Sequence, residues 1–243
     1  MSVAIGIALA GVAAGGLVQS ATGFGFALIA APVATAALGP ALGVPTVVVA
    51  SLVVNTLTLA GERRRPAVIG RDALVLTLAS LPGMAVGAAI LANASADVLR
   101  VIVALVVAGS VVAVVRGARP RQGERPSGAG AGLVSGALAT TSGINGPPLL
   151  LHLRRVGADP VQARDTLAIV FVGSGVLTLV SLALAGALRL PAAAFVVVAG
   201  AVAGQVAGRW AFAALEGRRE AATRCVLALS VAVAAVPALQ ALA

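Results

Sequence analysis

Two short polar stretches decide how this chain folds: residues 19–25 read QSATGFG, and residues 140–148 read TTSGINGPP. The first interrupts an apolar segment over 3–38, and the second interrupts an apolar segment over 128–153. Glycine weakens a helix and proline cannot donate the helical hydrogen bond, so a continuous helix is not expected through either stretch. Each segment is therefore predicted to be a broken or re-entrant helical hairpin.

The composition places these hairpins in a lipid bilayer. Of 243 residues, 60% are hydrophobic and only 10% are charged, whereas a soluble domain carries about a quarter charged residues. The apolar residues come in runs of roughly twenty, which as helices cross a hydrocarbon core of about 30 Å. The runs lack the alternating pattern of a transmembrane β-barrel. The sequence therefore predicts an all-α polytopic membrane protein.

Six further runs lack ionised side chains except at their ends, and with the two interrupted segments they make about eight hydrophobic segments. Arg100 and Arg224 lie near run ends, where a long cationic side chain can reach the headgroups. The predicted complete spans are 41–60, 73–92, 97–115, 166–186, 191–208 and 222–242.

The chain also reads as an internal duplication. Residues 20–23 (SATG) align with residues 140–143 (TTSG) at an offset of 120. The Gly-x-x-x-Gly motif at 83–87 aligns with the same motif at 204–208 at an offset of 121. The predicted units are repeat 1 over 1–115, a basic linker over 116–127 and repeat 2 over 128–243.

The arginines predict the orientation. All 17 cations are arginine, and most lie in four loops, at 61–72, 116–127, 154–165 and 209–224. If both interrupted segments crossed the membrane once, the first two loops would lie opposite the last two, against the positive-inside rule. If each segment instead returns to its own side, all four loops are cytoplasmic.

In that arrangement the poorly charged connections 39–40, 93–96 and 187–190 face outward. Each repeat is one hairpin followed by three spans, and the two repeats are inverted. Inverted repeats are typical of secondary transporters. We therefore predict a multi-pass protein of the inner (plasma) membrane in a bacterium.

The two breaks are expected to meet near the midplane and to form the substrate site. A helix begins after each break, and its first N–H groups and partial positive charge favour an anion. The polar side chains there are neutral hydrogen-bond donors, and the only carboxylate in a predicted span is Asp97, at the first position of 97–115. The predicted substrate-binding residues are Gln19, Ser20, Thr22, Gly23, Gly25, Thr140, Thr141, Ser142, Gly143, Asn145 and Gly146, with Asn55 as a cavity-lining candidate.

Simpler interpretations stand beside this one. Hydroxyl groups in a helix often return to backbone carbonyls, and glycines spaced four apart usually serve helix contacts. Hydrogen bonding between helices explains Asn55 equally well, and His152 is expected at the cytoplasmic interface beside Arg154.

No enzyme motif is present, neither HExxH nor GxSxG nor a pair of intramembrane aspartates, so no catalytic residue, metal site or cofactor is predicted. The net charge of +9 is explained by the loops, and nucleic acid is not an expected partner. The expected partners are the lipid bilayer and a small anion.

Residues 16–32 (GLVQSATGFGFALIAAP) and 132–151 (GLVSGALATTSGINGPPLLL) resemble the two signature segments of the sulfite exporter TauE/SafE family. The resemblance covers essentially the whole chain in length, duplication and span order. It implies a bacterial or archaeal permease for anions such as sulfite, sulfonates or thiosulfate.

We predict an anion transporter that works by alternating access, with both breaks forming its site. The alternatives are an anion channel and a non-transporting membrane scaffold or assembly protein. Sequence patterns leave open which anion is carried, whether it is imported or exported, coupling to protons or sodium, and the oligomeric state.

Overall fold

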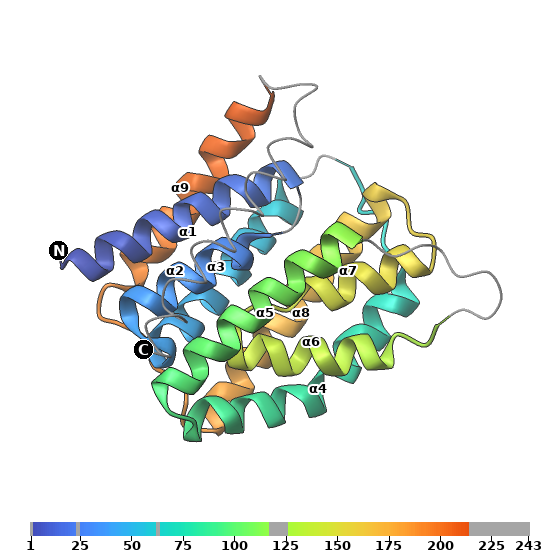
Figure 1. The fold of residues 1–243 in the computed structure, drawn as a ribbon. Coiled ribbons are helices and arrows are strands. Elements are labelled where there is room, and N and C mark those ends of the chain that lie inside the picture. Colours follow the sequence, from blue (N-terminus) through green and yellow to red (C-terminus); the bar gives the residue numbers. More distant parts are fainter. Residues whose placement is uncertain (1, 23–24, 62–63, 117–125, 214–243) are drawn as a thin grey trace.

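The computed structural model describes residues 2–22, 25–61, 64–116 and 126–213, and Figure 1 shows that these segments are built of packed helices. No strand occurs within these four segments, so the predicted all-helical class is confirmed. The described helices are α1 (Val3–Thr22), α2 (Phe26–Leu38), α3 (Pro40–Ala60), α4 (Gly70–Asn93), α5 (Ala96–Arg116), α6 (Ala129–Ser142), α7 (Gly146–Arg155), α8 (Pro160–Leu184) and α9 (Ala194–Ala213).

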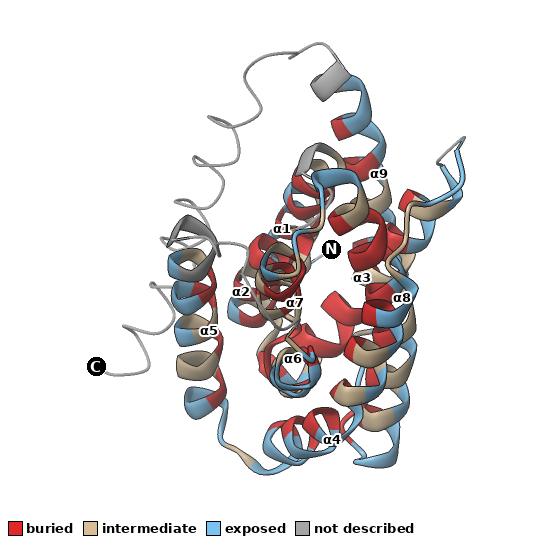
Figure 2. Ribbon diagram, turned by 90° about the vertical axis from the view of Figure 1, so that its right-hand side faces the viewer, coloured by how far each residue is buried: buried red, intermediate tan, exposed pale blue. Residues whose placement is uncertain are grey.

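Four of these helices, α1, α3, α4 and α8, are long and apolar enough to cross a membrane. Their outer sides carry large apolar side chains, such as Leu74, Leu78 and Leu81 along one face of α4. Figure 2 shows exposed positions along the outer sides of α4, α5 and α8, and buried positions turned towards the interior. A soluble protein rarely exposes so much contiguous apolar surface, whereas lipid accepts it.

Most predicted spans coincide with helices. The ranges 41–60, 73–92 and 97–115 lie inside α3, α4 and α5. The helix over 166–186 starts earlier than predicted, at Pro160, and ends at Leu184. The helix over 191–208 begins at Ala194, and the predicted span 222–242 lies outside the described residues.

The early start of α8 has a local cause. Asp159 accepts hydrogen bonds from the backbone N–H groups of Val161 and Gln162, and the Gln162 side chain accepts from the Asp159 N–H. This capping box satisfies helix donors that would otherwise lack partners. Pro160 at the first helical position needs no hydrogen-bond partner, so the helix begins there rather than at the first apolar residue.

Both interrupted segments are broken helices. Between α1 and α2 the chain passes through Gly25 with φ 99°, and between α6 and α7 it passes through Gly143 with φ 75°. Residues with a side chain rarely adopt these left-handed conformations. With 14 and 10 residues, α6 and α7 span roughly 21 and 15 Å, so neither crosses a bilayer alone.

The small-residue motif of α4 packs against α6. A side chain at Gly83 would collide with the backbone carbonyl of Leu133, and one at Gly87 would collide with Ala137 and the Thr140 hydroxyl. The missing side chains let the two helices approach closely. This agrees with the packing role expected for these glycines.

The same contacts recur between α9 and α1. Gly204 faces the carbonyl of Ala13, and Gly208 faces Leu17 and the Ser20 hydroxyl. Each of these residues is related to its counterpart in the α4–α6 contact by the offsets of 120 and 121 found in the sequence. The first helix of each predicted hairpin thus packs on a helix of the other predicted repeat.

Candidate functional site

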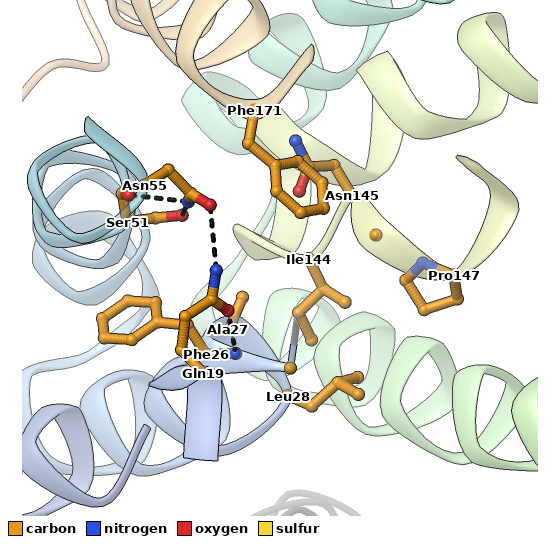
Figure 3. Close-up of a pocket in the computed structure, with 12 residues that line it drawn as sticks. Gln19, Phe26, Ala27, Leu28, Ser51, Asn55, Ile144, Asn145, Pro147 and Phe171 are labelled. Carbon is orange, nitrogen blue, oxygen red and sulfur yellow. Dashed lines mark hydrogen bonds between the residues drawn. The ribbon is translucent and has the colours of Figure 1, made fainter. Parts of the chain in front are cut away.

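The two helix breaks face one small cavity (Figure 3). Its walls come from the end of α1, the start of α2, the middle of α3, the α6–α7 break and α8. Of the predicted site residues, the structure brings Gln19, Gly25, Asn55, Asn145 and Gly146 together there. The full lining is Gln19, Gly25, Phe26, Ala27, Leu28, Ser51, Asn55, Ile144, Asn145, Gly146, Pro147 and Phe171.

Gln19 occupies the centre of a buried amide network. Its side-chain oxygen accepts a hydrogen bond from the Phe26 N–H at 3.1 Å, and its side-chain nitrogen donates to the Asn55 Oδ1 at 2.9 Å. Asn55 in turn donates to the carbonyl and hydroxyl oxygens of Ser51, at 2.7 and 3.1 Å. Gln19 therefore caps the start of α2 and links α1 to α3, as Figure 3 shows.

The second break presents fewer backbone donors than expected. The helix α7 begins with Gly146, Pro147 and Pro148, and proline has no N–H, so only Gly146 can donate from the first three positions. The Asn145 amide lies beside this helix start and donates to the Ser174 hydroxyl at 3.3 Å. An anion in the cavity would thus meet mainly side-chain amides, together with the positive end of α7.

The predicted hydroxyl residues point into their own helices. Ser20 donates to the Leu17 carbonyl, Thr141 to Ala137 and Ser142 to Leu138, at 2.6, 2.8 and 2.8 Å. These groups do not line the cavity, which matches the simpler interpretation given above.

The remaining predicted residues lie around the breaks. Thr140 is fully buried and donates to the carbonyl of Met84 on α4 at 3.2 Å. Gly143 lies against Val47, outside the cavity lining. Thr22 ends α1, and Gly23 lies outside the described residues.

The cavity is small and uncharged. The space open to the centre of a water molecule is about 20 Å³, which is room for about one water. No residue in its lining carries a formal charge. That space is too small for a four-atom oxyanion in this conformation.

Sequence reasoning missed two serines at the central cavity, one in its lining and one bonded to Asn145. Ser51 lies one helical turn before Asn55 on the same face of α3, so the spacing of four residues could have indicated it. Ser174 is an ordinary serine in an apolar run, and only the tertiary structure places it beside Asn145.

Charged residues gather at the arginine-rich end of the helices. Arg64 binds both carboxylate oxygens of Asp165, at 2.7 and 3.0 Å, and the Ala67 N–H donates to the same carboxylate at 2.7 Å. These bonds tie the connection between α3 and α4 to the start of α8.

A second buried pair lies nearby. His152 Nε2 is 2.9 Å from Asp72 Oδ1, and both residues are buried. His152 was expected at the cytoplasmic interface beside Arg154, and its side chain lies buried against α4 near the arginine-rich end. Asp72 and Asp165 both precede the predicted spans by one residue, and neither lines the cavity. In the described part of the chain, no cluster of three His, Cys, Asp or Glu residues is placed to hold a metal ion.

A family model described as "Sulfite exporter TauE/SafE" matches residues 7–236. The chain belongs to this family. The matched range includes both helix breaks and every residue that lines the cavity, and it confirms the resemblance found in the signature segments. The TauE/SafE protein shows no significant similarity to a curated protein or to a solved structure.

Membership of the TauE/SafE family identifies a membrane transport protein. The lipid-facing helices agree with that function. The structure of the TauE/SafE chain adds a cavity at the two helix breaks whose polar lining consists mainly of neutral amides. The buried carboxylates Asp72 and Asp165 lie outside it, at the arginine-rich end.

Proposed function

We propose that this TauE/SafE protein is a permease for a small sulfur oxyanion or organosulfonate, such as sulfite, and that the cavity between the two breaks is its substrate site. The observation that carries the proposal is the convergence of three side-chain amides, from Gln19, Asn55 and Asn145, on a cavity lined by no carboxylate. Amide N–H groups donate to oxyanion oxygens, and the absence of negative charge in the lining avoids repulsion.

In the proposed site Gln19, Asn55, Asn145 and the Gly146 N–H contact the anion directly. Gly25 lets the anion approach the backbone, because no side chain covers it. The other predicted residues shape the two breaks, and helix movement would bring their hydroxyls or backbone closer to the substrate. These residues are Ser20, Thr140, Thr141, Ser142 and Gly143, while Thr22 and Gly23 stay predicted members of the site.

The proposed mechanism is alternating access between two inverted repeats, with the four arginine loops in the cytoplasm. The contacts of α4 with α6 and of α9 with α1 support it, because they recur at the offsets of the sequence duplication. The small size of the central cavity also supports it, since a closed site must open to one side at a time. An open channel would need a continuous water-filled path through the same residues.

The test is a thermal shift of the purified protein against sulfite, sulfate, thiosulfate, taurine, sulfoacetate and chloride. A ligand that binds only the folded form stabilises it by about 2.7 kcal/mol at a concentration of 100 Kd. We expect one sulfur oxyanion to raise the Tm and Asn145→Leu to abolish the rise. Gln205→Leu is the matched control, because Gln205 is a buried amide outside the cavity lining.

Flux into proteoliposomes separates the alternatives. A transporter gives saturable flux of the stabilising anion, whereas a channel gives flux that rises linearly with concentration. A wild-type protein that folds but responds to none of these anions, in either Tm or flux, would contradict the proposed function and favour the scaffold alternative.

A further inference from the structure

A second and larger cavity lies at the ends of the helices farthest from the arginine-rich loops. Its volume open to water is about 560 Å³, many times the roughly 30 Å³ that one water occupies in the liquid. Its walls are formed by the α2–α3 connection, the α4–α5 turn and the α8–α9 connection. These are the connections that the sequence predicts to face outward. A hydrated small anion therefore has room there.

The described lining of this cavity carries one positive charge. Arg189 is the only charged residue that lines the cavity. Asp97 and Arg100 lie nearby on α5, and they pair with each other at 2.6 Å, which cancels their charges. Among the described residues, no carboxylate lies within ion-pair distance of Arg189. The larger cavity thus presents a net positive charge to the solvent.

The floor of this cavity is a thin apolar layer. Leu91, Leu99 and Ala187 line the cavity and also belong to a buried cluster that includes Val44 and Leu182. Both Val44 and Leu182 are fully buried. These side chains close the cavity on its inner side through apolar contacts.

The layer is short in the direction of the central cavity. Val44 precedes Ser51, which lines the central cavity, by seven residues of α3, a rise of about 10 Å. Between them Val47 lies against Gly143 of the second break, and a side chain added at Gly143 would come 3.3 Å from Val47. Ile144, the next residue, lines the central cavity. On α3 the nearest lining residues of the two cavities, Ala41 and Ser51, are ten residues apart, a rise of about 15 Å.

The opposite end is closed more firmly. A buried cluster that includes Leu149, Leu153 and Leu167 lies between the central cavity and the arginine-rich loops. The ion pair of Asp165 with Arg64 and the contact of Asp72 with His152 reinforce it.

We propose that the larger cavity is an outer vestibule that binds small oxyanions, with Arg189 attracting the anion and the layer around Val44 and Leu182 acting as the gate to the central site. The identity of the anion as the transported substrate rests on the proposed function. The attraction of anions into the vestibule by Arg189 is independent of the proposed function.

The vestibule is tested first without transport. Ala185 is exposed and lines the cavity, so Ala185→Cys in a Cys225→Ser protein places a single thiol there. The protein is reconstituted and treated with anionic sulfonatoethyl and cationic trimethylammonioethyl methanethiosulfonates at low salt. A unit charge about 8–10 Å away in water changes the local concentration of each reagent about twofold, in opposite directions. We expect the anionic reagent to react about fourfold faster, relative to the rates of both reagents with a free thiol.

Charge variants assign this preference to Arg189. Arg189→Gln is expected to remove it and Arg189→Lys to keep it. Arg155→Gln, an exposed arginine on α7 at the opposite end, should leave it unchanged. Equal rates for the two reagents, or a preference that survives Arg189→Gln, would overturn the proposal.

Transport then tests the link to the substrate. With sulfite supplied from the outer side, Arg189→Gln is expected to raise KM about twofold or more with kcat unchanged, and Arg189→Lys to restore it. An unchanged KM in a transporting Arg189→Gln protein would overturn the role of the vestibule in the path. If the wild type carries no sulfite, the proposed function fails, while the labelling result still decides whether the vestibule attracts anions.

Discussion

Replacing Gln19 by leucine removes its buried hydrogen bonds to Phe26 and Asn55 with little change in side-chain volume. The Phe26 N–H loses its only side-chain acceptor in the described structure, and an orphaned buried N–H costs about 1–3 kcal/mol. The bond from Gln19 to Asn55 links two helices, and such bonds in membrane proteins contribute about 0.6 kcal/mol on average and at most about 1.7. Together these terms predict a loss of about 2–3 kcal/mol in the free energy of unfolding.

For a chain of this size the loss corresponds to a fall in Tm of about 4–12 °C. The assay is thermal unfolding in detergent, followed for the wild type and for two glutamine variants. Gln205→Leu is the matched control, because Gln205 is equally buried and donates to Thr58 at 2.8 Å, but its side-chain oxygen has no hydrogen-bond partner. Removing that unsatisfied oxygen offsets the lost bond, so the control should lie within about 1 kcal/mol of the wild type. Equal destabilisation by the two substitutions would refute the capping role assigned to Gln19.

Two further predictions follow from paired positions. Thr178→Val should leave the Tm unchanged or raise it, because the buried Thr178 hydroxyl has no hydrogen-bond partner among the described residues. Thr140→Val should lower the free energy of unfolding by about 1 kcal/mol, because it removes the hydrogen bond to α4. A stabilising effect of Thr140→Val would contradict this account. Gly136→Ala should destabilise the protein by about 1–3 kcal/mol, because the added methyl group would collide with the backbone of α4. Gly109→Ala should stabilise it by up to about 1 kcal/mol, because no atom lies within 4 Å of the added methyl group. Similar Tm values for the two alanine variants would show that the α4–α6 contact is looser than described.

Helix breaks and membrane-facing helices could be predicted because they depend on local sequence. A run of about twenty apolar residues has few alternatives to a membrane helix, and a glycine such as Gly143 takes a conformation that other residues avoid. The start of α8 was missed because a polar capping box around Asp159 extends the helix beyond its apolar part. That signal is local too, and the Asp-Pro-x-Gln pattern at 159–162 could have indicated it.

The candidate site was only partly foreseeable. Polarity near the breaks pointed to Gln19 and Asn145, which line the cavity, and equally to Ser20 and Thr141, which do not. Hydroxyls have short side chains that reach the carbonyl four residues back, so in a helix they satisfy themselves. The longer amides of Gln19 and Asn145 reach beyond their own helix, and their surroundings decide where they bond.

Sequence alone determined that this protein is helical, lies in a membrane, carries two broken segments and repeats its motifs at a constant spacing, because each of these properties follows from composition and periodicity along a single stretch. Tertiary structure decided which polar groups share a cavity, which carboxylates find partners and that Arg189 lines the larger cavity. Asp165 and Arg64 are about a hundred residues apart in the chain, and Asp72 and His152 are eighty apart. Contacts between such distant residues depend on how the helices pack, which no local pattern encodes.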